Sequence, residues 1–311
     1  MSENLLKNHL KIATRGSRLA IWQAEFVRNK ILQFAPDFNV QIIPFITEGD
    51  KRLDQSLAEI GGKGLFIKEL EKALIEGEAD MAVHSIKDFP VNLPDHFSLA
   101  AVLERGDPRD VFVSNLSQEI SSLPENSIVG TSSFRRCSLI SSKYSNVKLL
   151  PLRGNLETRL KKLDMGDYDG IVLAAAGLKR LGMQSRIASY FEPSDFLPAV
   201  GQGAVGIEIL KESKTLFKFL SSLEHQPSRW CVDAERAMIA RLGGDCNFPI
   251  GGFAEIRGTE GFLKGFVSNP AGTVVLFHQS SKSSFNNPEY LGEIVAKGLI
   301  KKGALQLLAN I

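Results

Sequence analysis

The chain has 311 residues, of which 43% are hydrophobic and 23% are charged, a composition typical of a globular protein rather than a disordered or fibrous one. At about 100–200 residues per domain, this length predicts two or three domains, each large enough to bury its own core. The formal net charge of +2 identifies no class of partner by itself.

The cysteines and the apolar runs indicate the compartment. Cys137, Cys231 and Cys246 are odd in number and none pairs with another in a CxxC motif, which argues against a disulfide framework or a zinc site and fits a reducing cytosol. Residues 1–10 lack the apolar centre of a signal peptide. The longest apolar run, 171–176, is far too short to span a membrane. We therefore expect a cytoplasmic protein.

The first two thirds of the chain alternate short apolar strands with helical patterns, which is the rhythm of a parallel-type sheet covered by helices. A boundary signal, Arg105-Gly-Asp-Pro108, separates two such blocks. In the first block we predict strands at 11–14, 40–47, 80–84 and 99–103, and helices at 17–33, capped by Ser17, and 66–76. In the second we predict strands at 111–114, 128–130, 148–152 and 170–173, and helices at 134–142, 155–163 and 175–181.

After a second break at 197–201, the regular alternation of strands and helices is replaced by helices followed by antiparallel strands. We predict a strand at 204–210, helices at 215–223 and 227–242, three antiparallel strands at 252–256, 263–268 and 274–279, and a closing helix at 289–308. The pattern indicates two α/β domains and a smaller α+β domain at the C-terminus.

Local charge is informative where net charge is not. Residues 131–180 contain ten Lys and Arg against four Asp and Glu, a net charge of +6. This stretch predicts either a focused anion site or a solvated helix face.

Three strand-to-helix turns, 14–18, 130–136 and 152–155, share one design. Each combines a small capping residue with a helix N-terminus, where free N–H groups and the helix dipole favour anions. Each also carries arginine, which opposes that dipole but grips carboxylates bidentately. The turns predict an anion cradle; the alternative is surface arginines paired with local acids. The arginines are Arg15, Arg18, Arg135, Arg136, Arg153 and Arg159.

Lys87 and Asp88 follow the predicted strand 80–84, where a sheet delivers side chains to a binding site. An aspartate among cations stays ionised and could stabilise a developing positive charge or move a proton. A structural Lys–Asp pair is the alternative. His84, within the apolar stretch, is expected to be a satisfied core histidine.

Two glycine motifs are weaker. The loop 61–64 around Lys63 lacks the Ser or Thr of a P-loop, and is either a mobile lid or an ordinary turn. The sequence 201–206 matches GxGxxG, but it leads into a strand instead of opening a helix, so we reject dinucleotide binding.

Cys246 lies on a predicted loop between Gly244 and Pro249, whereas Cys137 and Cys231 fall in helical patterns and are expected to be buried. A loop thiol of this kind is a candidate for covalent chemistry. The neighbouring Asp245 disfavours a thiolate and therefore argues against a nucleophile of low pKa.

Taken together, the motifs resemble the porphobilinogen deaminase family almost from end to end. The matching segments are Ile12-Ala-Thr-Arg-Gly-Ser17, Gly61-Gly-Lys-Gly-Leu-Phe66, Ala82-Val-His-Ser-Ile-Lys-Asp88, Gly130-Thr-Ser-Ser-Phe-Arg-Arg136, Leu152-Arg-Gly-Asn155, Ala176-Gly-Leu-Lys-Arg180, Pro198-Ala-Val-Gly-Gln-Gly203 and Glu235-Arg236 through Cys246.

The resemblance implies an enzyme that converts four porphobilinogens and water into hydroxymethylbilane and ammonia. The product grows on a dipyrromethane cofactor held in thioether linkage by Cys246, and Asp88 stabilises the positive charge on the pyrrole nitrogen as ammonia leaves. The implied catalytic residues are Asp88, Arg15 and Lys63. Implied cofactor contacts are Cys246, Lys87, Asp88, Thr131, Ser132, Ser133, Arg135, Arg136, Arg153 and Arg159, and implied substrate contacts are Arg15, Ser17, Phe66, Arg153, Arg159 and Arg180.

The resemblance also implies a fold: two periplasmic-binding-protein-like α/β domains flanking a cleft, plus a smaller C-terminal α+β domain that carries the cysteine. The strand after Gly203 would return to the first domain. The expected domains are 1–103 with 204–222, 104–203, and 223–311. No metal is implied, and we expect a monomer that binds the small molecule porphobilinogen, with no nucleic acid or membrane partner.

Two positions depart from the family pattern. Asp245 stands where glycine or serine usually precedes the cysteine, so we expect a different loop conformation and an added negative charge beside the cofactor. Glu48 replaces a residue that is often basic, and we expect this change to be peripheral.

Two other classes of protein compete with this interpretation. A two-lobed receptor for a small anion would share the fold, but the missing signal peptide and the placement of Cys246 argue against it. A nucleic-acid binder would need aromatic residues interleaved with the basic stretch or a recognised motif, and the sequence has neither.

Overall fold

The structure is a computed structural model of the chain and describes residues 8–51, 67–244, 248–280, 283–284 and 287–309. The chain divides into two compact units. Unit 1 comprises Met1–Arg105 and Ala204–Arg229, and unit 2 comprises Gly106–Gly203 and Trp230–Ile311. The finer division into three domains with the limits given above stays a prediction.

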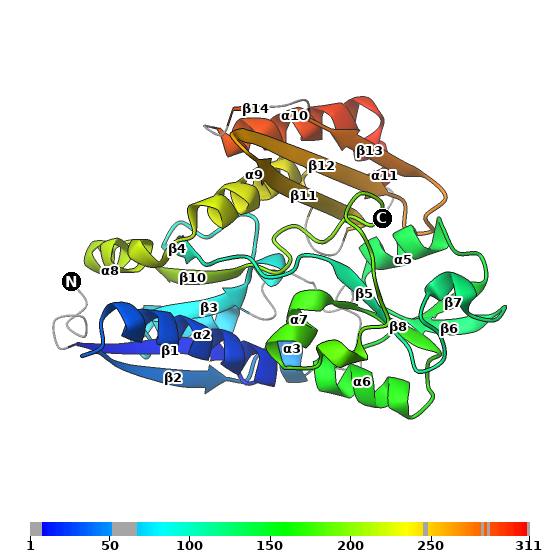
Figure 1. The fold of residues 1–311 in the computed structure, drawn as a ribbon. Coiled ribbons are helices and arrows are strands. Elements are labelled where there is room, and N and C mark those ends of the chain that lie inside the picture. Colours follow the sequence, from blue (N-terminus) through cyan, green and yellow to red (C-terminus); the bar gives the residue numbers. More distant parts are fainter. Residues whose placement is uncertain (1–7, 52–66, 245–247, 281–282, 285–286, 310–311) are drawn as a thin grey trace. The chain divides into compact units, whose positions relative to one another are not determined.

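Unit 1 is built on a five-stranded sheet of order β2-β1-β3-β10-β4 (Figure 1). β1 runs parallel to β2 and β3, whereas β10 runs antiparallel to β3 and β4. The predicted return of the chain after Gly203 is confirmed, since Val205 pairs with Ser85. The strands are β1 (His9–Arg15), β2 (Asn39–Phe45), β3 (Met81–Ser85), β4 (Phe97–Val102) and β10 (Val205–Leu210).

The prediction of a parallel-type sheet is therefore right for β1, β2 and β3, whereas β10, for which no direction was predicted, runs antiparallel to its neighbours. Parallel neighbours need a crossover connection within the same sheet. β10 instead enters unit 1 directly from unit 2, so no crossover helix dictates its direction.

Helices cover both faces of this sheet, because successive residues of a strand point to opposite sides. Leu10 and Ile12 of β1 share a core with α2, whereas Ala13 packs with residues of α4. The helices are α2 (Arg18–Phe34), α4 (Lys68–Ile75) and α8 (Lys214–Leu220), with the short α3 (Glu48–Lys51), η1 (Ile86–Asp88) and η4 (Ser221–Leu223).

Unit 2 repeats the strand pattern in a second sheet, of order β7-β6-β8-β5-β9. β6 runs parallel to β7 and β8, and β5 runs antiparallel to β8 and β9. Phe112 packs on the α5 side of this sheet, and Val111 packs on the side of α6 and α7. The strands are β5 (Asp110–Val113), β6 (Ser127–Gly130), β7 (Val147–Leu150), β8 (Gly170–Ala174) and β9 (Ser189–Tyr190). The helices are α5 (Phe134–Ser141), α6 (Leu156–Asp164) and α7 (Ala175–Arg180), with η2 (Ile120–Ser122) and η3 (Gln184–Arg186).

The C-terminal part of unit 2 is an antiparallel sheet, β11-β12-β13, with β14 paired to β12. Phe266 of β12 lies in the same core as Phe112 and Phe196, so this sheet shares apolar packing with the α/β part of unit 2. The elements are α9 (Gln226–Leu242), β11 (Ile250–Arg257), β12 (Glu260–Ser268), β13 (Val275–Gln279), β14 (Ser283–Ser284), α10 (Pro288–Lys301) and α11 (Ala304–Leu308). The predicted fold class, two α/β parts and a smaller α+β part, is confirmed.

The single closing helix predicted at 289–308 is wrong. Gly303 adopts φ +99° and separates α10 from α11. A left-handed residue ends an α-helix, and glycine takes that conformation without the steric cost that other residues meet.

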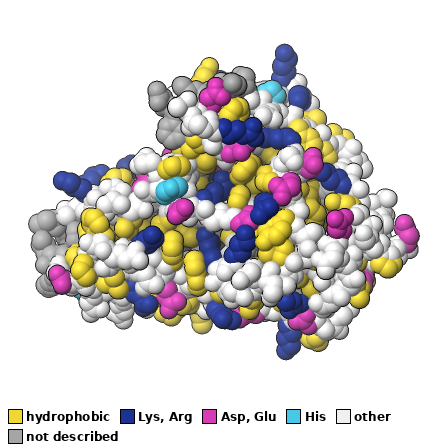
Figure 2. Space-filling model, in the orientation of Figure 1, with side chains coloured by type: hydrophobic (Ala, Val, Ile, Leu, Met, Phe, Trp, Pro, Cys, Tyr) yellow, Lys and Arg dark blue, Asp and Glu magenta, His cyan; other side chains and the backbone are white. Residues whose placement is uncertain are grey.

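Charge is mixed over the molecular face drawn in Figure 2, where acidic and basic side chains lie among hydrophobic ones. This distribution agrees with the net charge of +2. In the part of the chain that the structure describes, no helix is long and apolar enough to cross a membrane.

Candidate active site

The first predicted turn lies in unit 1, between β1 and α2. Ser17 caps α2, its Oγ accepting from the backbone N–H of Ala20 at 3.3 Å. Arg15 forms an ion pair with Asp50, and Asp50 also accepts from the Thr47 hydroxyl at 2.7 Å. Partial burial would raise the pKa of Asp50, but hydrogen bonds from Arg15 and Thr47 outweigh burial and lower that pKa. The Arg15 guanidinium is thus already held by a carboxylate, a partner that the sequence pattern did not predict.

Asp88 and Lys87 lie directly after β3, in the single turn η1. Ile86 anchors this turn: its side chain is buried, and its N–H donates to the Ala204 carbonyl at 3.1 Å. Asp88 is exposed and Lys87 is half-buried. The end of β3 therefore delivers Asp88 to solvent, where a dissolved substrate can reach it.

His84 is a core histidine, as predicted. Its Nε2 lies 2.9 Å from Glu208 Oε2, and both side chains are buried. The pair ties β3 to β10 and takes His84 out of the set of catalytic candidates.

The second turn lies in unit 2, at the N-terminus of α5. Ser133 caps this helix by accepting from the N–H of Arg136, and the Ser133 N–H donates to Thr131 Oγ1 at 3.3 Å. Ser132 Oγ donates to the Leu152 carbonyl at 3.0 Å, which links this turn to the third one. The three hydroxyl residues thus lie around one helix N-terminus.

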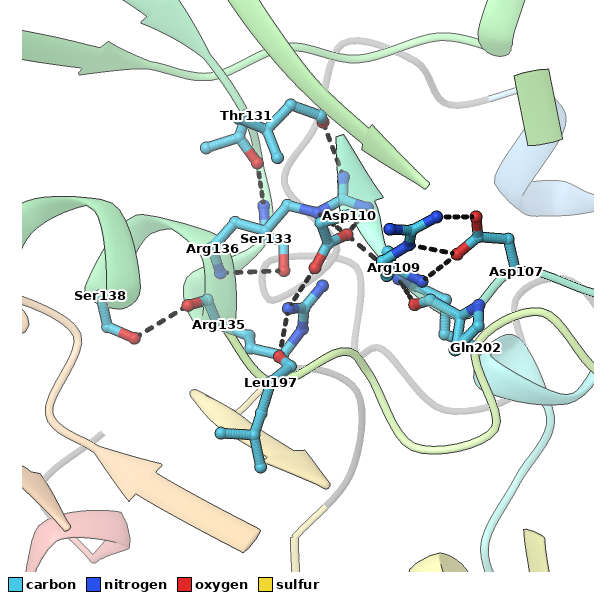
Figure 3. Close-up of polar contacts among 12 residues, drawn as sticks. Asp107, Arg109, Asp110, Thr131, Ser133, Arg135, Arg136, Ser138, Leu197 and Gln202 are labelled. Atoms are coloured by element: carbon cyan, nitrogen blue, oxygen red, sulfur yellow. Dashed lines mark hydrogen bonds and ion pairs between the residues drawn. The ribbon is translucent and has the colours of Figure 1, made fainter. Parts of the chain in front are cut away.

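Arg135 and Arg136 turn into the interior and share the carboxylate of Asp110 (Figure 3). Arg135 Nη1 lies 2.6 Å from Asp110 Oδ2, and Arg136 donates to Oδ1 through Nε at 3.0 Å and Nη2 at 2.7 Å. Each arginine also donates to a backbone carbonyl, Leu197 for Arg135 and Val172 for Arg136. We call these three charged residues the arginine–aspartate cluster.

The cluster holds a net buried charge of one positive unit, because two guanidiniums share one carboxylate and all three residues are at most 5% exposed. Burial would raise the pKa of Asp110, but the charges of Arg135 and Arg136 outweigh burial and lower that pKa to about 2. Asp110 is therefore ionised at neutral pH, and the uncompensated positive charge favours an anion nearby. Asp110 precedes the strand predicted at 111–114 and was not singled out in the sequence; in the structure it is the first residue of β5.

The third turn carries Arg153 and Arg159. Gly154 adopts φ +110°, and its carbonyl accepts from Arg159 Nε at 2.8 Å. Asn155 caps α6, its Oδ1 accepting from the Thr158 N–H at 2.9 Å. All three predicted turns thus have the capped helix N-terminus expected from the sequence.

Arg180 lies at the end of α7, where its Nη2 donates to the Gly203 carbonyl at 2.6 Å. Burial lowers the pKa of Arg180 to about 10, so the guanidinium is still charged at neutral pH. A carboxylate approaching this group would offset the unfavourable burial of its charge.

A further ion network in unit 2 was not predicted. Asp107 accepts from Arg109 at 2.9 Å and from Lys179 at 2.6 Å, and Arg109 also pairs with Glu192 at 2.9 Å. Partial burial would raise the pKa of Asp107, but hydrogen bonds from Arg109 and Lys179 outweigh burial and hold that pKa far below its usual range. Lys179, one of the cations of the basic stretch 131–180, is thus held in a structural ion pair.

The described site residues fall in both units. Arg15, Ser17, Lys87 and Asp88 belong to unit 1, and Thr131, Ser132, Ser133, Arg135, Arg136, Arg153, Arg159 and Arg180 belong to unit 2. Lys63, Phe66, Asp245 and Cys246 lie outside the described residues.

The other two cysteines lie in helices. Cys231 is buried as expected, whereas Cys137 is half-buried, with its pKa raised by burial. The GxGxxG sequence, residues 201–206, leads into β10 (Val205–Leu210) and opens no helix, so the structure agrees with the rejection of a dinucleotide fingerprint.

Comparison with known proteins identifies the chain's relatives. Residues 10–218 match the family model "Porphobilinogen deaminase, dipyromethane cofactor binding domain", and residues 230–301 match "Porphobilinogen deaminase, C-terminal domain". The porphobilinogen deaminase of Chromobacterium violaceum is 50% identical over 300 residues, covering 96% of this chain and 97% of that protein. The porphobilinogen deaminase of Methylobacillus flagellatus is 49% identical over 302 residues, 97% of each chain.

Solved structures give more distant matches. A putative methionine-binding lipoprotein from Bacillus subtilis matches with a TM-score of 0.45 and 12% identity over 70% of this chain and 91% of that one. Immunogenic lipoprotein A from Vibrio vulnificus matches with a TM-score of 0.45 and 10% identity over 71% of this chain and 96% of that one.

Proposed function

Because the chain belongs to the porphobilinogen deaminase family, we propose that Cys246 carries a dipyrromethane cofactor in thioether linkage and that the residues described above act on it. The chain has hydroxymethylbilane synthase activity in tetrapyrrole biosynthesis. It couples four porphobilinogens head to tail, releasing one ammonia at each coupling, and water then releases the linear tetrapyrrole.

The arginine–aspartate cluster is the observation that supports this proposal most strongly. Every pyrrole unit carries an acetate and a propionate, so the bound chain gains negative charge with each coupling. A buried excess of positive charge beside the capped N-terminus of α5 suits such a ligand. We assign cofactor contacts to Lys87, Asp88, Thr131, Ser132, Ser133, Arg135, Arg136, Arg153 and Arg159, and substrate contacts to Arg15, Ser17, Phe66, Arg153, Arg159 and Arg180.

Arg15 and Arg180 suit exchangeable carboxylates better than the cluster does. Arg15 has side-chain exposure of 27% and is paired with Asp50, which a substrate carboxylate could replace. The Arg180 guanidinium is charged although it is partly buried, and a bound anion would offset the free-energy cost of burying that charge. The cluster arginines, by contrast, are fixed by Asp110 and provide a constant positive field.

Asp88 is proposed as the central catalytic residue, with Arg15 and Lys63 assisting. Its carboxylate stabilises the positive charge on the pyrrole nitrogen of porphobilinogen as the carbon–nitrogen bond breaks and ammonia leaves. It does so again when the free α-carbon of the chain attacks and the new carbon–carbon bond forms, and it can accept the proton that the attacking ring then loses. The cofactor, when bound, supplies the nucleophilic α-carbon for the first coupling. Its covalent attachment makes each coupling effectively intramolecular.

We propose a cytoplasmic monomer whose partner is the small molecule porphobilinogen and which binds neither nucleic acid nor membranes. The odd cysteine count and the near-neutral net charge support this.

Intact-protein mass spectrometry tests the proposed function. Freshly purified active protein should exceed the mass of the bare chain by one dipyrrole, and Cys246→Ser should abolish the excess. Cys137→Ser is the matched control and should retain the excess, because Cys137 lies in helix α5 and its thiol is half-buried. An unmodified mass in active protein would contradict the proposal, and an unmodified, inactive protein that binds a small anion would favour the receptor class.

A further inference from the structure

One short segment of unit 2, residues 197–203, contacts predicted ligand-binding arginines on one side and the C-terminal domain on the other. We call it the junction segment. It contains two glycines in the left-handed region, Gly201 at φ +69° and Gly203 at φ +89°. Side chains other than glycine rarely adopt this conformation, so the path of the segment is specified by its sequence.

On the arginine side, the junction segment accepts hydrogen bonds from two guanidiniums. The Leu197 carbonyl accepts from Arg135 Nη1 at 2.7 Å, and the Gly203 carbonyl accepts from Arg180 Nη2 at 2.6 Å. Gln202 adds a third link, since its Nε2 donates to Asp110 Oδ1 at 3.1 Å (Figure 3). The positions of Arg135 and Arg180 are therefore coupled to the path of this segment.

On the other side, the segment is bonded to the domain that carries Cys246. The Pro198 carbonyl accepts from the Gly252 N–H at 3.1 Å, and the Gly201 N–H donates to Glu235 Oε2 at 2.7 Å. The second oxygen of Glu235 accepts from the Ala254 N–H of β11 at 2.8 Å. Glu235 thus joins three pieces of chain: its own helix α9, strand β11 and the junction segment.

Glu235 is fully buried, and both its carboxylate oxygens are bonded to backbone N–H groups. Charge-assisted hydrogen bonds of this length are among the strongest in proteins. A buried carboxylate is costly unless it is bonded in this way. Helix α9 ends at Leu242, four residues before Cys246. The helix that precedes the cysteine in sequence therefore also carries Glu235, which is hydrogen-bonded to the junction segment.

We infer that Glu235 is a positioning residue: acting through the junction segment, it fixes the position of the cysteine-bearing domain relative to the guanidiniums of Arg135 and Arg180. The inference rests on the proposed function, since this relative position matters only if Cys246 carries the growing chain. Its loss would move the carboxylate-binding groups relative to the covalent anchor. A misplacement of about 1 Å can slow a reaction about a hundredfold.

Glu235→Gln is the variant that tests this role. The amide keeps the size of the side chain, but it offers one acceptor and one N–H₂ donor where two backbone N–H groups point. One of these N–H groups, Gly201 or Ala254, then faces a donor. Asp169→Asn is the matched control: Asp169 Oδ2 accepts from the Ile128 N–H at 2.7 Å in the same unit, outside the junction segment.

The experiment uses the full-length, cofactor-bearing protein and combines three measurements. Hydrogen exchange of the peptide covering 197–203 should be about tenfold faster in Glu235→Gln and unchanged in Asp169→Asn. Intact mass should show the dipyrrole in both variants. In Glu235→Gln the kcat for porphobilinogen should fall at least about tenfold, because misplacement of the attached chain relative to Arg135 and Arg180 slows every coupling. KM should change less than about threefold, because the substrate contacts Arg15 and Ser17 lie in unit 1, outside the junction segment. In Asp169→Asn both constants should stay at their wild-type values.

A loaded Glu235→Gln protein with wild-type kcat would overturn the inference, and so would a kcat loss without faster exchange in the junction segment. A wild-type protein that lacks the dipyrrole would contradict the proposed function instead, so the two failures are distinguishable. If Glu235→Gln does not fold, Gly201→Ala distorts the same segment through its φ of +69° and leaves Glu235 in place. The same pattern of faster exchange and lower kcat is expected there, and wild-type kinetics would overturn the inference.

Discussion

Two aspartates lie in opposite environments, and the environments suit different tasks. Asp110 is fully buried between two guanidiniums, with its pKa lowered to about 2 against burial, so it is a permanent structural anion. Asp88 is exposed at the end of η1 and is accessible to a substrate. At the residue scale, the carboxylate proposed for chemistry is the one that the fold leaves in solvent.

Replacing Asp88 with Asn should separate chemistry from cofactor attachment. The variant should keep the mass excess of the dipyrrole, since Cys246 is intact, but turnover of porphobilinogen should fall by about 10²–10⁴-fold, because the amide cannot stabilise a developing positive charge or accept a proton. Steady-state rates together with intact mass measure both effects. Asp95→Asn, an exposed carboxylate in the same unit, is the control. Near-normal rates for Asp88→Asn would remove Asp88 from the mechanism.

Replacing Asp110 with Asn should destabilise the fold. Two buried guanidiniums lose their shared counter-charge, and breaking such a buried pair costs about 3–5 kcal/mol of unfolding free energy. Urea unfolding at pH 7 measures the loss. Asp164→Asn is the control: Asp164 pairs with Arg186 at the surface, where ion pairs contribute little.

The unfolding free energies of the wild type and of Asp110→Asn should depend differently on pH in the acid range. The pKa of Asp110 is lowered in the folded state from 3.8 to about 2, so the stability that this ionisation supplies is complete above about pH 4 and is lost as the pH falls toward 2. The difference in unfolding free energy between wild type and Asp110→Asn should shrink across that window. A difference that stays constant from pH 5 to about 2 would contradict the assigned pKa direction.

At the scale of elements, left-handed glycines decide where segments turn or end, and two of them can be compared directly. At Gly303 a Cβ would meet only Gln306 Oε1 at 3.6 Å, whereas at Gly203 it would lie 2.7 Å from the Gly106 carbonyl oxygen. Gly303 therefore needs glycine for its conformation alone, and Gly203 needs it for conformation and space.

Gly303→Ala should therefore cost about 1–2 kcal/mol of unfolding free energy from backbone conformation. Gly203→Ala should cost about 3 kcal/mol or more, because a backbone clash adds to the conformational cost. Thermal and urea unfolding of the two variants measure these losses. Equal losses would show that the close approach of Gly203 to Gly106 does not contribute to stability.

At the scale of the whole molecule, the chain passes between units 1 and 2 three times, so each unit is built from two separate stretches of the same chain. We expect the functional protein to be a single chain. Light scattering coupled to size-exclusion chromatography should give the monomer mass, 34.1 kDa plus the dipyrrole, over a wide range of protein concentration. A stable mass twice as large would contradict the proposed monomer.

Much of the fold could be predicted from sequence, because strands and helix starts depend on local patterns. The capping residues Ser17, Ser133 and Asn155 were recognisable from their place before a helical pattern, and each caps its helix in the structure. The strand direction of β10 was not predictable in this way, because it depends on where the chain re-enters the sheet.

Residue type and short spacing were sufficient to predict the family, the fold class and the three capped turns. Which charges compensate one another became known only from the folded chain. Asp110 meets Arg135 across 25 positions, Glu235 meets Gly201 across 34, and His84 meets Glu208 across 124. No local pattern encodes such pairs, because a buried charge is bonded to whichever group the packed chain brings within hydrogen-bond distance.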